Sequence, residues 1–108
     1  MSAEFHVKFM DSEWFDKNRG QIAAKIKSLP SFAREETQDE YWLSGAEPHI
    51  EHDSLPLDVR LWLRGDRIDI DISASSPTAY ADLAAIISWL RHNTAIEVLD
   101  DDDLPSGW

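Results

Sequence analysis

The sequence predicts an α+β protein: a mostly antiparallel sheet of about four to five strands, with two helices packed on one face. Three observations predict this class. Two segments carry apolar residues at helical spacing, two alternating segments flank a glycine turn, and shorter alternating segments lie near both ends of the chain. Because 108 residues leave room for one core only, we expect a single domain over residues 1–108, with an acidic C-terminal tail at 100–108.

The first two elements are a strand and a helix. Residues 4–10 alternate between apolar and polar side chains, which predicts a strand with one buried face. The next segment, residues 12–29, starts with N-cap candidates and is followed by Pro30, and it therefore predicts an amphipathic helix. Gly20 inside it costs about 1 kcal/mol relative to alanine, so a break there is an alternative. The apolar positions of this helix are Phe15, Ile22, Ile26 and Leu29.

The middle of the chain contains a β-hairpin. Residues 57–63 and 68–72 alternate on either side of a turn at Gly65-Asp66. The register places Leu63 opposite Ile68, so that all seven apolar side chains share one face. The other face is polar apart from one tryptophan, and it carries Asp58, Arg60, Trp62, Asp69 and Asp71. Before the hairpin, residues 31–56 mix loop signals with two short segments, 40–44 and 49–52, that we assign as strands.

The last two elements are a second helix and a strand. Ser76 is a suitable N-cap and Pro77 suits the first helical position. Apolar residues then follow at helical spacing as far as Leu90, which predicts a helix with one buried face. Residues 95–99 predict a short final strand, which leads into four consecutive aspartates, Asp100–Asp103.

Charge and composition limit the partners. The chain has 21 acidic and 10 basic residues, a net charge of −11, and residues 51–108 carry most of it, with twelve acids and four bases. This balance disfavours nucleic acid and anionic membrane surfaces as direct ligands. The chain has no cysteine, no signal-peptide pattern and no apolar run long enough to span a membrane, so we expect a soluble, cytoplasmic protein.

Several patterns resemble chemical sites, but each has a simpler structural interpretation. His49 and His52 lie among acids and offer metal ligands, yet in a strand they would point to opposite faces, which favours a polar loop. Asp69 and Asp71 would be about 7 Å apart on one strand face, a distance that glycosidase-like roles allow, but an exposed strand face beside Arg60 is the stronger explanation. The Arg64–Asp66 tripeptide matches a hairpin turn. Finding no nucleophile motif and no phosphate-binding loop, we expect no catalysis, metal or cofactor.

The two tryptophans on polar segments, Trp42 and Trp62, are either packed under a loop or exposed as anchors for a partner. In size, acidity and architecture the chain resembles, at the level of the class, bacterial immunity proteins, the small cytoplasmic inhibitors of cognate toxins. The resemblance implies a basic toxin domain, such as a nuclease, as partner, which an acidic inhibitor would reach rapidly through electrostatic steering. Under this interpretation Asp58, Trp62, Asp69 and Asp71 contact the partner, while Asp100, Asp101, Asp102 and Asp103 steer it.

Two other functions remain open. The chain could be a small acidic adaptor or homo-oligomerising subunit that buries its exposed sheet face against a second copy. A small enzyme is the third hypothesis. The four aspartates, taken alone, also fit a solvated tail that serves solubility.

Overall fold

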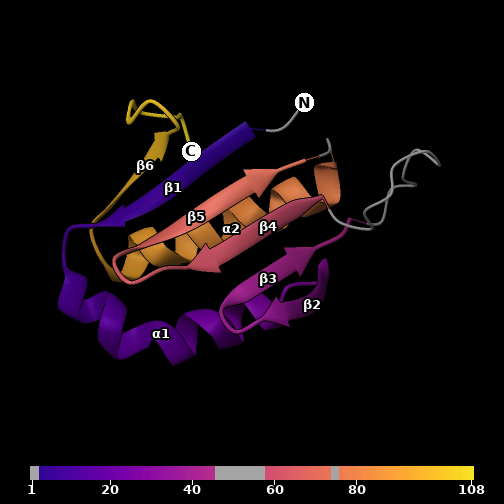
Figure 1. Ribbon diagram of the computed structural model, residues 1–108, viewed down its shortest axis with the longest axis horizontal. Helices are drawn as coiled ribbons and strands as arrows, with labels where there is room; N and C mark the ends of the chain where they lie inside the picture. The colour runs from indigo at the N-terminus through magenta and orange to yellow at the C-terminus, as the bar shows by residue number, and fades with distance from the viewer. Residues whose placement is uncertain (1–2, 46–57, 74–75) are drawn as a thin grey trace.

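The protein is an α+β domain with two helices and a six-stranded antiparallel sheet (Figure 1). The computed structural model describes residues 3–45, 58–73 and 76–108, and every statement of number or absence below refers to this part of the chain. Across the sheet the strands lie in the order β2-β3-β4-β5-β1-β6. In chain order the elements are β1 (Ala3–Phe9), α1 (Ser12–Lys27), β2 (Phe32–Thr37), β3 (Glu40–Leu43), β4 (Val59–Leu63), β5 (Arg67–Ile72), α2 (Pro77–Asn93) and β6 (Ile96–Asp100).

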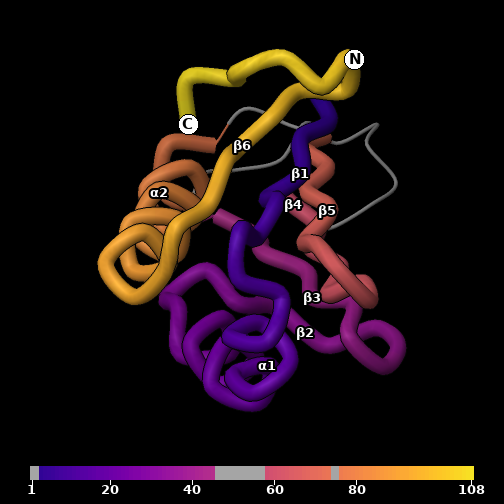
Figure 2. Tube along the Cα trace, turned by 90° about the vertical axis from the view of Figure 1, so that its left-hand side faces the viewer, coloured from indigo at the N-terminus to yellow at the C-terminus, as the bar shows by residue number. Residues whose placement is uncertain are grey.

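Both helices contribute to one apolar core on a single face of the sheet. Figure 2 shows α2 lying along one side of the strands. Helix α1 reaches the same layer, since Trp14 on α1 packs against Trp89 on α2 with ring centroids 6.3 Å apart. Phe15 on α1 also stacks on Phe9 of β1 at 4.3 Å. The opposite face of the sheet is left without a covering helix. Neither of the two helices is long and apolar enough to cross a membrane.

The predicted hairpin register is confirmed. Strands β4 and β5 pair with Leu63 opposite Ile68 and Trp62 opposite Asp69, and the inward aliphatic side chains of both strands are buried. Both predicted N-terminal helix signals are also confirmed. The Asp11 carboxylate accepts a hydrogen bond from the Trp14 amide at 3.2 Å, and the Ser76 hydroxyl accepts one from the Ala79 amide at 3.2 Å.

The structure differs from the sequence prediction in three respects. Strand β2 was not expected, because five of its six side chains are exposed and it lacks apolar alternation, as is common in edge strands. Helix α1 continues through Gly20, so the alternative of a break there is wrong. Of the two short segments assigned as strands, 40–44 is confirmed by β3, and 49–52 lies outside the described residues.

Candidate protein-binding surface

The uncovered face of the sheet brings β1 beside the hairpin. Because β5 pairs with β1 as well as with β4, Asp71 lies opposite both Arg60 and Glu4, and Asp69 lies opposite Trp62 and His6. Cross-strand neighbours on one face are close enough for their side chains to interact. The polar face predicted for the hairpin is therefore continued onto β1, and we call the uncovered side of all six strands the open face.

Trp62 lies half-buried at the centre of the open face, between two arginines. The guanidinium carbons of Arg60 and Arg64 are 5.0 and 5.4 Å from its ring centroid, distances at which a cation is attracted to an aromatic ring. Each of these arginines also forms an ion pair with a carboxylate of β5. These contacts restrict the motion of the Trp62 ring, and such restriction lowers the entropy lost when a partner packs on it.

Asp69 and Asp71 both lie on the open face, as predicted, but their surroundings differ. Asp69 has a partner on each oxygen, with Arg64 Nε at 2.8 Å from Oδ2 and Arg67 Nε at 2.9 Å from Oδ1. Asp71 is bonded through Oδ2 alone, to Arg60 Nη2 at 3.0 Å. The Asp71 side chain is 13% exposed, and its Oδ1 is buried without a hydrogen-bond partner in the described part of the chain. Nε of Arg60 is also buried without a hydrogen-bond partner, so this ion pair is made through one of the two contacts that a bidentate arginine–carboxylate pair can form.

A second aromatic group on the open face lies on β3. The Trp42 indole N–H donates to Glu40 Oε2 at 2.8 Å, and the Arg34 guanidinium carbon lies 4.6 Å from the ring centroid. The hydrogen bond from Trp42, supplemented by one from Trp62, holds the pKa of the Glu40 carboxyl below its ordinary value. Trp42 is half-buried, so, like Trp62, it presents an ordered aromatic surface on the open face.

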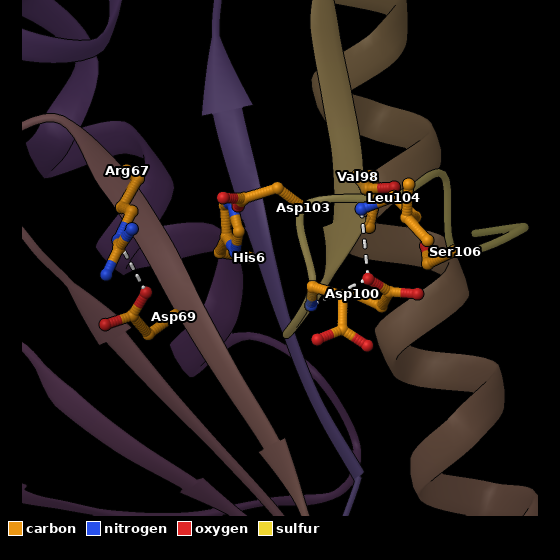
Figure 3. A network of polar contacts seen from close by, with 9 residues as sticks. His6, Arg67, Asp69, Val98, Asp100, Asp103, Leu104 and Ser106 are labelled. Atoms are coloured by element: carbon orange, nitrogen blue, oxygen red, sulfur yellow. Dashed lines mark hydrogen bonds and ion pairs between the residues drawn. The ribbon is translucent and has the colours of Figure 1, made fainter.

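The acidic run does not extend away from the domain as a tail. Asp100 ends β6, and its Oδ1 accepts hydrogen bonds from the amides of Asp102 and Leu104 at 2.9 and 3.0 Å, which closes a tight turn. Asp103 adopts a positive φ of 61°, and its carboxylate lies 3.1 Å from His6 Nε2 on β1. Figure 3 shows the Asp103 carboxylate beside the His6 ring and the Asp100 side chain turned back toward its own loop.

After the turn, the chain returns along β6. Pro105 forms a bridge with Leu99, and the Ser106 amide donates to the Val98 carbonyl at 3.1 Å. The chain then reaches Trp108, whose ring packs edge-on against Phe5 at 6.0 Å and against Tyr80 at 5.9 Å. The aspartates are therefore fixed to the domain on both sides.

A hollow of about 400 Å³ opens between these groups on the open face. Strand β1 provides Glu4 and His6, the hairpin provides Trp62 and its charged neighbours, and the C-terminal turn provides Asp101 and Asp103. Besides Phe5 and Ile70, the lining consists of Trp62 and ionisable residues, namely Glu4, His6, Arg64, Arg67, Asp69, Asp71, Asp101 and Asp103. Five carboxylates thus face two guanidinium groups, so the hollow attracts cations.

One aspartate predicted as a partner contact, Asp58, lies elsewhere in the structure. Asp58 is only 3% exposed, and its Oδ2 accepts a hydrogen bond from the Gly45 amide at 2.7 Å, so it is a buried structural group and lies outside the open surface. Of the four aspartates predicted to steer a partner, Asp101 and Asp103 line the hollow, whereas Asp100 and Asp102 do not. His49 and His52 lie outside the described residues.

The residues missed from the sequence are those that β1 and the arginines contribute. Glu4 and His6 occupy the polar positions of the alternation in residues 4–10, but the sequence does not reveal that β1 inserts between β5 and β6. Arg64 and Arg67 belong to the hairpin turn and its exit, where the sequence pattern indicated only a turn. The alternation of polar residues in each strand predicts which side chains point to the open face, but it does not predict which strands are neighbours in the sheet.

Comparisons of the chain with protein-family models, with curated proteins and with solved structures find no match. Any function must therefore be argued from the open face itself.

Proposed function

We propose that this protein is an acidic inhibitor of the immunity type, which binds a basic toxin domain, such as a nuclease, on the open face of its sheet. The observation that carries the proposal is the hollow: five carboxylates and an ordered tryptophan gathered on the one sheet face that no described helix covers. Tryptophan and arginine are enriched among the residues that dominate binding energy at protein interfaces. The resemblance to immunity proteins suggests the identity of the partner.

The distribution of charge supports a basic protein as the occupant. Arg64 and Arg67 both pair with Asp69, Arg60 pairs with Asp71, and Asp103 lies beside His6. Among the described residues, Glu4 and Asp101 are therefore the carboxylates of the hollow that have no ion pair. With a net charge of −11, the chain as a whole repels nucleic acid and attracts a basic domain. A toxin that binds nucleic acid has a basic active-site surface, and an acidic protein seated on that surface would exclude the substrate.

The burial of each residue indicates whether it should contact the partner directly or only attract it from a distance. Trp62 and Asp71 are partly buried at the centre and would be desolvated by a partner, so they should control dissociation. Asp101 and Asp102 are exposed at the rim, and their charge should act mainly on the association rate and its dependence on salt.

The test is purification of the tagged protein from the cells that naturally produce it, identification of co-purified proteins by mass spectrometry, and measurement of binding rates with the recovered partner. We expect a basic protein whose toxicity is suppressed by this chain. Trp62→Ala should speed dissociation about 30-fold, which corresponds to roughly 2 kcal/mol. Asp16→Asn is the matched control for charge variants, because Asp16 is exposed on α1 in the helical layer.

Two results would overturn the proposal. A homodimer with no basic partner would favour the adaptor or oligomerising subunit. A basic partner whose dissociation rate is unchanged by Trp62→Ala, in a variant shown by circular dichroism to be folded, would place the interface elsewhere than on the open face.

A further inference from the structure

We propose that Arg19 on α1 is a positioning residue for the open face: it bonds to the two turns that border Trp62 and so limits the motion of that ring before a partner binds. The inference rests on the proposed function and assigns to that surface a residue that lies outside it. It is carried by the hydrogen bonds of Arg19, by the place of the two turns in the sheet and by the contacts of Trp62.

Arg19 connects α1 to the end of the sheet at which both turns lie (Figure 1). Its Nη1 donates to the Arg64 carbonyl, and its Nη2 donates to the Leu63 carbonyl at 3.0 Å. These two acceptors belong to the hairpin turn and the end of β4 that leads into it. Nη2 also donates to Asp39 Oδ2, at 3.3 Å, in the turn between β2 and β3. One guanidinium group thus bonds to both turns.

The hairpin turn carries Arg64, whose side chain returns to the open face. Arg64 Nε bonds to Asp69 Oδ2 at 2.8 Å, and its guanidinium carbon lies 5.4 Å from the Trp62 ring centroid. The backbone of Arg64 is held through both of its polar groups, since its amide donates to the Arg67 carbonyl at 2.8 Å and its carbonyl accepts from Arg19. A fixed backbone limits where the side chain can reach, so Arg19 supports one flank of the Trp62 ring.

The turn between β2 and β3 contains Asp39, which adopts a positive φ of 67°. Residues other than glycine rarely take this conformation, although a short polar side chain that bonds nearby tolerates it. The Asp39 carboxylate accepts from Arg19, and its carbonyl accepts a hydrogen bond from the Leu63 amide at 2.9 Å. The next residue, Glu40, lies opposite Trp62 and accepts a hydrogen bond from its indole. Arg19 therefore supports the other flank of Trp62 as well.

Arginine is suited to this place because three acceptors converge on one side chain. A guanidinium presents five N–H donors in a rigid plane, whereas a lysine ammonium is a point charge on a flexible stem. Arg19 is itself held on its helix, since its guanidinium carbon lies 4.9 Å from the centroid of the buried Phe15 ring. It is not among the described residues that line the hollow, so its effect on binding should be exerted through the order of Trp62.

The first measurement uses the free protein. Hydrogen exchange of the Trp62 indole, followed by ¹⁵N NMR, reports how often its hydrogen bond to Glu40 opens, and exchange of the α2 amides reports unfolding of the whole domain. In Arg19→Ala the Trp62 indole should exchange about tenfold faster than in wild type, relative to the α2 amides. Arg19→Lys keeps the charge but loses the planar donors, so it should give most of the same effect, and it remains informative if Arg19→Ala fails to fold.

Ile26→Val is the matched control. Ile26 is buried on the same helix, and the loss of one methylene group lowers the stability of the domain without removing a hydrogen bond of either turn. It should accelerate exchange at the Trp62 indole and in α2 by the same factor. Equal acceleration at these two places in the Arg19 variants would show a contribution to stability alone and would overturn the inference.

The second measurement uses the basic partner recovered with the tagged protein. Arg19→Lys should speed dissociation of that partner about fivefold, because the ring is less ordered before binding, while Ile26→Val should leave the rate unchanged. Faster exchange of the Trp62 indole with an unchanged dissociation rate would overturn the inference alone. A homodimer with no basic partner, in a protein whose Trp62 indole responds to Arg19→Lys as expected, would overturn the proposed function and leave Arg19 as the residue that orders Trp62.

Discussion

Replacing Asp100 with alanine should destabilise the protein, whereas replacing its neighbour Asp101 should not. Asp100 Oδ1 accepts two backbone hydrogen bonds inside the turn, at 2.9 and 3.0 Å. Each contributes about 0.5–1.5 kcal/mol net, and since the turn is largely exposed we take the lower part of that range. The expected loss for Asp100→Ala is therefore about 1–2 kcal/mol, or roughly 5–10 °C in Tm for a domain of this size.

Urea unfolding at neutral pH measures this loss, and two variants control it. Asp100→Asn retains the side-chain oxygen that accepts both bonds and should stay close to wild type. Asp101→Ala removes one negative charge from the same turn without removing either bond. In Asp100→Ala the indole resonance of Trp108 should also shift, because this turn leads into the segment that ends at that ring. Equal stability of Asp100→Ala and Asp101→Ala, or equal losses in Asp100→Ala and Asp100→Asn, would refute the assigned role.

Two further predictions concern pH and salt. The pKa of Glu40 is held below its ordinary value of 4.5, mainly by the Trp42 indole, so its ionised form stabilises the fold above that pH and this contribution is lost as the pH falls through the lowered pKa. At neutral pH, Glu40→Gln should therefore have a lower free energy of unfolding than wild type, as measured with urea. On acidification below pH 4.5 the variant should lose less of that free energy than wild type does, and an equal pH dependence of the two proteins would contradict this role of Glu40. Replacing Asp101 and Asp102 with asparagine should slow association with a basic partner and flatten its salt dependence, while dissociation and unfolding change little; stopped-flow rates that do not depend on ionic strength would contradict the steering role.

Local pattern was sufficient to predict the hairpin and the second helix. The register of β4 with β5 follows from alternation on both sides of a short turn, so Trp62 and Asp69 could be paired from the sequence. The start of α2 follows from Ser76 and Pro77, which are signals confined to a few residues. In these elements the partners that fix the structure are close together in the chain.

Where the partners are distant, the sequence did not suffice. The hollow depends on β1 lying beside β5, a contact between residues more than 60 positions apart, as in the pair His6 and Asp69. The acidic run was interpreted by its charge, although the same aspartates also form a turn through backbone hydrogen bonds. The alternation of residues 57–63 predicts an exposed side chain for Asp58. The carboxylate is buried instead, because it accepts a hydrogen bond from the amide of Gly45, 13 residues earlier in the chain.

The return of the chain after the C-terminal turn has a consequence for how partners can attach. Residues 105–106 bond to the second half of β6, so the chain itself occupies the backbone groups on that edge of the sheet. The opposite edge is β2, which has two register shifts against β3 and is rich in charged side chains, features that hinder the addition of a strand. A protein that recognises this domain by extending its sheet would meet an obstructed backbone at both edges. Recognition is therefore directed to side chains, where a change of one residue can alter the choice of partner without disturbing the sheet.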